Sequence, residues 1–171
     1  MVFENNQHEI GTLPSIDAVQ YERVSPKYVR ARISVLGIFF VASIMILTIL
    51  SLIYPNYRLL FYLLMILMAL FGSILVFYIF KSYKHIGVVV RDHDIMYKEG
   101  LWFRNEMVIT FNKIQHIEIS MGAIERFFNL SSLKIFTAGG SGSDLEIHGL
   151  ERQKAQKLKD FILGNISSEE E

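Results

Sequence analysis

The strongest pattern in the chain is a pair of long, uncharged apolar runs, at residues 33–53 and 59–80. Neither run contains Asp, Glu, Lys, Arg or His. Each is long enough to cross the hydrocarbon core of a bilayer, which requires roughly 20 apolar residues in a helix. The runs also lack the polar face that a helix on the surface of a small soluble domain shows. They therefore predict two transmembrane helices.

The linker between the two runs, residues 54–58, is long enough only for a tight turn. Pro55 favours the end of the first helix, and Tyr54 and Tyr57 suit the headgroup region of a bilayer. The two helices are therefore expected to be antiparallel neighbours. A cleaved signal peptide is not expected, because the first run begins only after residue 32 and the second follows at once.

Small residues of the two runs fall at matching depths when positions are counted outward from the turn. Ala42 and Ser43 are level with Ala69, and Gly72 and Ser73 are level with two phenylalanines of the first run. Small residues allow two helix backbones to approach closely in a membrane. One hypothesis is that Ala69 and Ser73 form such a contact. The alternative is that both are small residues facing lipid.

Lysine and arginine are distributed unevenly around the runs. The flanks carry Arg23, Lys27, Arg30 and Arg32 before the first run and Lys81, Lys84 and Arg91 after the second, whereas the turn carries only Arg58. The positive-inside rule then predicts a multi-pass membrane protein with both termini in the cytoplasm. Ser25 followed by Pro26 predicts that the first helix begins before the membrane.

From His85 onward the apolar runs give way to short alternating stretches rich in Val, Ile, Tyr and Phe, separated by Gly, Asn and Asp. Such alternation is typical of half-buried β-strands. Strands are predicted near residues 86–91, 95–99, 101–104, 107–111, 115–121, 132–138 and 144–148. This number of short strands suits a small antiparallel barrel or sandwich. Apolar residues at helical spacing then predict an amphipathic helix over residues 151–166 that caps the sheet.

Composition adds three limits to this picture. The chain is 51% hydrophobic with a mean hydropathy of +0.33, which fits a membrane protein. Lys+Arg and Asp+Glu are balanced at 17 each, so the basic surface of a nucleic-acid-binding protein is not expected. The absence of cysteine excludes disulfides, thiolate nucleophiles and Cys-ligated zinc.

No catalytic, cofactor-binding or metal-binding residue is predicted. The polar turn at residues 91–94 is interpreted as solvated, because neighbouring side chains in extended backbone point to opposite faces and seldom converge on one metal ion. His85, His116 and His148 lack the spacing of metal ligands or of a catalytic triad. The glycine-serine stretch at residues 139–143 is interpreted as a mobile hairpin loop, because no helix with a lysine follows it.

Two further features of the region near residue 126 are candidates for structure or binding. Arg126 lies between Ile124 and two phenylalanines, and a partly buried structural anchor is favoured over a ligand-binding role. Phe127 and Phe128 are interpreted either as core residues or as exposed aromatics that contact lipid or another chain.

Four short motifs, at residues 114–117 (IQHI), 125–128 (ERFF), 137–140 (TAGG) and 147–150 (IHGL), occur in this order after the two apolar runs. With the runs, they resemble the YdbS-like bacterial pleckstrin-homology (PH)-like membrane proteins from about Ser25 to Ile162. One departure is Asn129, where that family commonly has glycine; Asn tolerates a left-handed backbone better than most residues.

The resemblance implies a protein of the bacterial cytoplasmic (inner) membrane with a membrane-anchored α+β fold. In this fold a two-helix transmembrane hairpin precedes a small antiparallel PH-like β-barrel capped by a C-terminal helix. The expected organisation is a cytoplasmic N-terminal segment (1–24), the hairpin (25–83), a cytoplasmic PH-like domain (84–166) and an acidic tail (167–171). Phosphoinositide recognition is not expected, because the first turn holds more acidic than basic residues.

We expect a non-enzymatic, membrane-tethered interaction or scaffold module that acts with a membrane protein partner, a larger PH-like relative being one candidate. Membrane lipids are the other expected partners, and homo-oligomerisation through the hairpin is left open. The alternative function is an immunity or envelope-stress factor that protects against membrane-active peptides. No cofactor is expected.

Overall fold

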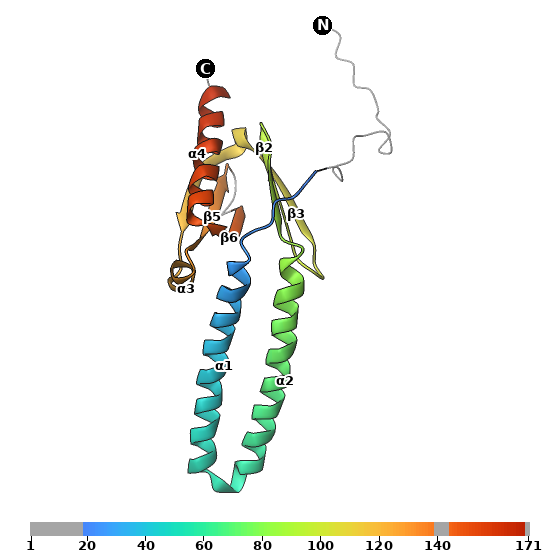
Figure 1. Cartoon of the computed structure of the whole chain (residues 1–171), viewed down its shortest axis with the longest axis vertical. Coiled ribbons are helices and arrows are strands. Elements are labelled where there is room, and N and C mark those ends of the chain that lie inside the picture. The colour runs from blue at the N-terminus through green and yellow to red at the C-terminus, as the bar shows by residue number, and fades with distance from the viewer. Residues whose placement is uncertain (1–18, 139–143, 170–171) are drawn as a thin grey trace, which may run out of the picture.

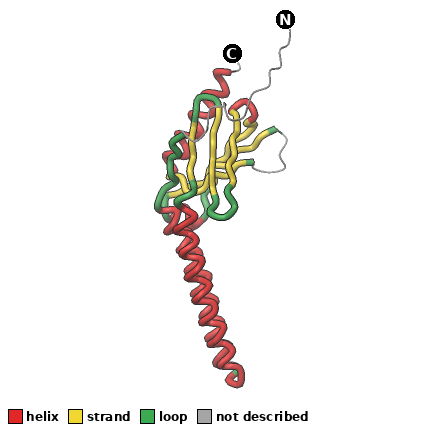
Figure 2. The backbone as a smooth tube through the Cα atoms, turned by 90° about the vertical axis from the view of Figure 1, so that its right-hand side faces the viewer, coloured by secondary structure: helices red, strands yellow, loops and turns green. Residues whose placement is uncertain are grey.

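The computed structural model describes residues 19–138 and 144–169, and it consists of a helical hairpin with a β-rich domain at its open end (Figure 1). Helices α1 (Lys27–Ile53) and α2 (Arg58–Tyr83) run side by side and are joined by the short 3-10 turn η3 (Pro55–Tyr57) (Figure 2). Both helices are long and apolar enough to cross a membrane, and each contains an 18-residue stretch with a mean hydropathy of 2.7. The predicted hairpin is confirmed, and both helices extend beyond the uncharged runs.

The contact between α1 and α2 follows a regular seam. The less exposed residues recur in steps of three and four: Leu36, Phe40, Ser43, Leu47 and Leu50 on α1, and Phe61, Met65, Met68, Gly72, Leu75 and Ile79 on α2. This spacing is that of helices packed at a small crossing angle, as in coiled coils. Gly72 lies against the ring of Phe40, from which a Cβ at position 72 would be only 2.9 Å away.

The proposed contact through Ala69 and Ser73 is wrong. Both residues are exposed, because the seam at this depth passes through Gly72. The Ser73 hydroxyl donates to the Ala69 carbonyl oxygen of its own helix at 2.9 Å. The small residue that permits close approach is therefore the neighbouring glycine.

The β-rich domain contains two three-stranded antiparallel sheets, each in sequential strand order. The first comprises β1 (Gly87–Val90), β2 (Asp94–Glu99) and β3 (Asn105–Thr110), and the second comprises β4 (Ile114–Ser120), β5 (Leu130–Thr137) and β6 (Leu145–Glu151). The turn η4 (Phe111–Lys113) connects the sheets, α3 (Ala123–Phe127) precedes β5, and α4 (Arg152–Glu169) follows β6. The capping helix is thus confirmed and continues through Glu169.

Two details of the predicted β structure differ. Across the described strands the two sheets do not pair into a closed barrel, so only the antiparallel β architecture is confirmed. Residues 101–104, predicted as a strand, form the turn between β2 and β3. Gly100 makes this turn possible, because its φ is +98° and a Cβ there would lie 1.8 Å from the Phe103 carbonyl oxygen. Asn129 accepts the expected left-handed conformation, with φ of 55°.

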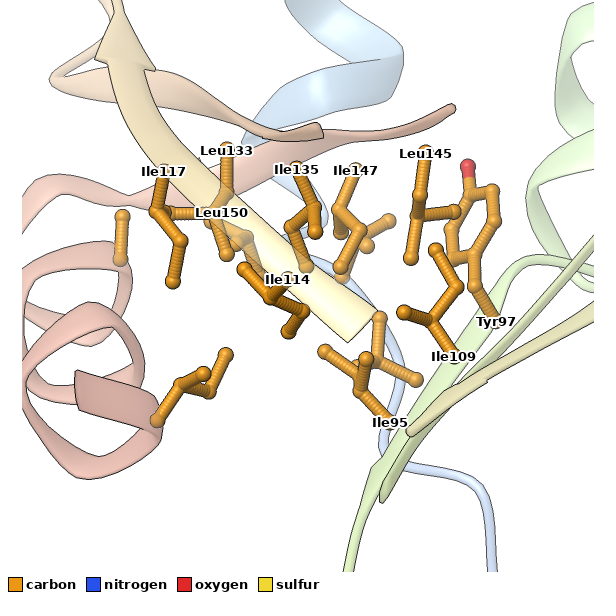
Figure 3. Close-up of a cluster of buried hydrophobic side chains, with 14 of the residues drawn as sticks. Ile95, Tyr97, Ile109, Ile114, Ile117, Leu133, Ile135, Leu145, Ile147 and Leu150 are labelled. Carbon is orange, nitrogen blue, oxygen red and sulfur yellow. The ribbon is translucent and has the colours of Figure 1, made fainter. Parts of the chain in front are cut away.

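The core lies between the two sheets (Figure 3). Ile95, Tyr97 and Ile109 of the first sheet face apolar side chains of the second, among them Ile117, Leu133, Ile135 and Ile147. The expected alternation is confirmed on β4 and β5, where Glu118 is exposed and Lys134 half-exposed between buried neighbours. Ala155 and Ile162 of α4 are fully buried and close this core.

Residues 20–26, here called the strap, connect the two sheets ahead of the hairpin (Figure 1). Glu22 exchanges two backbone hydrogen bonds with Val88 of β1, at 2.8 and 2.9 Å. The Ser25 N–H donates to the Gly149 carbonyl oxygen of β6 at 2.9 Å. Val24 between them is 2% exposed and belongs to the core. The globular domain therefore draws on residues from both sides of the hairpin in sequence.

Candidate functional site beside strand β1

The three histidines considered for metal or catalytic chemistry lie on different elements. His85 follows α2, with Nδ1 3.0 Å from the Lys81 carbonyl oxygen. His116 lies on β4 against the ring of Phe136. His148 lies on β6. In the described part of the chain, no group of three or more His, Cys, Asp or Glu side chains converges as metal ligands would.

A part-buried polar cluster that the sequence analysis missed surrounds the buried residue Ser132. The Ser132 hydroxyl donates to Oε1 of Glu125 at 2.8 Å and lies 2.9 Å from Nδ1 of His148. Because the serine has one proton and directs it to the carboxylate, Nδ1 of His148 must donate to the serine oxygen. The serine therefore lacks the serine-to-imidazole hydrogen bond of a nucleophile. The His148 ring also stacks on Tyr28 of α1, so the cluster connects α1, α3, β5 and β6.

The polar turn between β1 and β2 is held by an ion pair within it. The Arg91 guanidinium donates to both carboxylate oxygens of Asp94, with Nε 2.6 Å from Oδ1. This hydrogen bonding raises the pKa of Arg91 above its ordinary value. The interpretation of residues 139–143 as a mobile loop lies outside the described residues.

Arg126 is exposed on α3, so its predicted burial is wrong. The short helix turns this side chain outward, while its backbone N–H donates to the Gly122 carbonyl oxygen at 2.9 Å. The adjacent aromatics differ from one another: Phe127 is 84% exposed, whereas Phe128 is partly buried. Of the two alternatives left open, exposure therefore applies to Phe127.

A groove of about 660 Å³ is bounded by the strap, β1, the end of β6 and the first turns of α4. Val88, Val89 and Val90 provide an apolar wall, and Leu150 and Leu158 lie opposite. Val88 turns its backbone outward to bond Glu22. Since outward-facing residues alternate along a strand, Val90 presents its N–H and C=O on the same open side. The groove thus combines an apolar wall with exposed strand backbone.

Ion pairs at the rim of the groove hold the strap and α1 to the domain. Lys27 lies 3.0 Å from Glu151, whose pKa is lowered mainly by hydrogen bonding to that lysine. Lys154 pairs with Glu22, which raises the pKa of the lysine. Arg23 and Lys157 also line the groove, and neither has an ion-pair partner among the residues that the structure describes. The groove therefore carries a net positive charge.

Sequence reasoning missed this groove because its walls come from distant parts of the chain. The strap is separated from β1 by the whole hairpin, and α4 comes from the end of the domain. The only sequence signals were isolated apolar residues, such as Val24, in a polar segment. Such a segment is too short to show periodicity.

Comparisons with known proteins agree with this architecture. A family model described as "Bacterial PH domain" matches residues 32–166, which include most of α1, all of α2 and all six described strands. The UPF0699 transmembrane protein YdbS of Bacillus subtilis (strain 168) is 30% identical over 95 residues, 54% of this chain and 58% of that protein. No solved structure matches. The chain therefore belongs to the bacterial PH domain family and is a YdbS-like membrane protein.

Proposed function

We propose that this protein is a membrane-tethered interaction module whose groove beside β1 binds an extended segment of a membrane protein partner. The observation that supports the proposal is the combination of apolar wall, outward-facing strand backbone and net positive charge in one groove of about 660 Å³. Addition of a peptide strand to a sheet edge is a common mode of recognition, in which main-chain hydrogen bonds provide affinity and side-chain pockets provide specificity.

The charge of the groove favours an acidic partner segment. One of its lining cations is already paired, Lys154 with Glu22, and the lining residue Glu151 is paired with Lys27 of α1. Arg23 and Lys157 remain available to a carboxylate. Charged rims chiefly control the rate and specificity of association rather than its total free energy.

The tether fits this function. The strap and the domain lie at the same end of the hairpin (Figure 1), so both lie on one side of any membrane that the hairpin spans. The excess of Lys and Arg at this end supports the cytoplasmic side by the positive-inside rule. A module held there meets partners that are confined to the same membrane, which raises their effective concentration.

Site-specific crosslinking in intact membranes tests the proposal, because the chain has no cysteine of its own. A Val90→Cys variant carrying a photoreactive maleimide should form an adduct of defined mass with an integral membrane protein. A Gln115→Cys variant, exposed on β4 of the other sheet, is the matched control and should not form it. The adduct should also be lost when Lys157→Glu is combined with Val90→Cys.

Equal adducts from both cysteine positions would contradict the proposal, as would the lack of any adduct at Val90. An adduct that persists with Lys157→Glu would overturn the acidic character assigned to the partner. A product of twice the mass of the chain would identify a second copy as the occupant instead.

A further inference from the structure

Three large aromatic side chains are almost fully exposed on the face of the domain that adjoins the hairpin. Trp102 is 81% exposed and Phe103 85% exposed at the turn between β2 and β3, and Phe127 is 84% exposed on α3. Figure 1 shows this turn beside the domain end of α2, and α3 beside the domain end of α1. The exposed aromatics therefore occur on both flanks of the point where the helices enter the domain.

The depth of Trp102 is set by a contact with the membrane hairpin itself. Its ring meets the ring of Tyr78 edge to face, with centroids 5.9 Å apart and an interplanar angle of 66°. Tyr78 belongs to the uncharged run of α2 and lies three residues before Lys81, the first charged residue after that run. Three residues of helix correspond to about 4.5 Å along the axis. Trp102 thus lies at the boundary between the apolar span and the headgroup region.

Phe127 occupies a comparable level on the other flank. Helix α3 packs against α1. The uncharged run of α1 begins at Ile33, directly after Arg32, whose guanidinium lies over the Tyr28 ring at 5.5 Å. The boundary of the span on this side therefore falls within the first two turns of α1, next to α3 in Figure 1.

Cations accompany the aromatic turn on the α2 flank. Lys84, Lys98 and Arg104 surround a small depression of about 190 Å³ between α2 and the turn, together with Glu99 and Glu106. Lys81 lies over the ring of Phe77 at 5.3 Å, at the same end of α2. Aromatic rings with basic neighbours are the residues that proteins place at lipid headgroups.

We propose that the turn bearing Trp102 and Phe103, and the α3 residue Phe127, insert into the lipid interface on the two flanks of the hairpin. The domain then rests on the bilayer at three points, namely the paired helices and two aromatic contacts, rather than moving freely above it. The occupant of these aromatic surfaces is membrane lipid, because Trp102 is continuous with the lipid-facing surface of α2 through Tyr78. On the other flank, α3 packs against α1, close to the start of its uncharged run. This inference is independent of the partner groove.

The chain offers a direct probe, because Trp102 is its only tryptophan. The full-length protein is reconstituted into vesicles of zwitterionic and anionic phospholipid, with and without bromine at defined acyl positions. Lipids brominated near the headgroup should reduce the fluorescence more than lipids brominated near the chain ends. Aqueous iodide should have little effect, and the emission should be shifted to the blue.

Matched variants extend the test to the second contact. In a Trp102→Phe background, Phe127→Trp should be quenched by the brominated lipids, whereas Asp92→Trp, at the opposite end of β1 and β2, should be quenched by iodide alone. If iodide rather than brominated lipid quenches Trp102, or the tryptophan of the Phe127→Trp variant, the proposal is overturned. Protection from both quenchers would also overturn it, since the rings would then be covered by protein.

Discussion

Gly149 joins the globular domain to the membrane hairpin, and replacing it with alanine is expected to weaken that junction. Its φ is +76°, and a Cβ at this position would lie 2.7 Å from the Tyr28 Cβ and 2.6 Å from its Cγ. The carbonyl oxygen of Gly149 also accepts the Ser25 N–H from the strap. Tyr28 is in the first turn of α1, so the clash cannot be relieved by rotating a side chain alone.

The expected change in stability combines two costs and one smaller gain. A left-handed backbone costs an ordinary residue roughly 1–2 kcal/mol. Overpacking in a tight contact costs about 1–3 kcal/mol more. The reduced freedom of the unfolded chain returns about 0.4–1 kcal/mol. We therefore expect Gly149→Ala to lower the free energy of unfolding by about 1–4.5 kcal/mol, a large fraction of the stability of a small domain at the upper end.

Urea titration of the full-length protein in detergent, followed by pulse proteolysis, measures this difference. Gly164→Ala on α4 is the matched control, because nothing lies within 4 Å of its added Cβ. That change should be neutral or stabilising by about 0.5–1 kcal/mol, since alanine is favoured over glycine in a helix. In a Tyr28→Gly background the cost of Gly149→Ala should fall to the backbone strain less the gain from the less flexible unfolded chain, about 0–1.5 kcal/mol.

Two outcomes would refute this reasoning. If Gly149→Ala is as stable as Gly164→Ala, neither the strain nor the clash exists. If its cost is the same with tyrosine and with glycine at position 28, the added methyl group does not contact α1 in the way described.

Two further predictions concern the hairpin and the strap. Gly72→Leu should destabilise the hairpin by about 1–3 kcal/mol, because the leucine side chain would clash with the Phe40 ring. Ala69→Leu, on the exposed face, should not destabilise it. Equal melting temperatures of the two variants in detergent would contradict the helix contact through Gly72. Glu151 has a lowered pKa in the folded state, so its contribution to stability is present above its ordinary pKa of 4.5 and is lost as pH falls through the lowered value. Glu151→Gln should therefore flatten the pH dependence of unfolding below about pH 5, and an unchanged pH profile would count against the pairing with α1.

Local patterns predicted the elements well, and their failures have local physical causes. The region around Asn129 formed the turn expected of it, because the residue adopts φ of 55°. Residues 101–104 were predicted as a strand because three of the four are apolar, yet Trp102 and Phe103 are exposed at the base of the domain. Arg126 was expected to be buried by its apolar neighbours, but a short helix of five residues turns it outward. In both cases apolar sequence does not lead to burial.

The hairpin and the β-rich character of the domain were determined by the sequence itself. A membrane span requires only a continuous apolar run, and a strand requires only alternation, so both are properties of neighbouring residues. Whether Gly72 or Ala69 lies at the helix contact depends on which face α2 turns toward α1. The strap, the groove beside β1, the contact of Gly149 with Tyr28 and that of Trp102 with Tyr78 each join residues far apart in the chain. Only packing in three dimensions decides such pairs, because no local pattern records which surfaces meet.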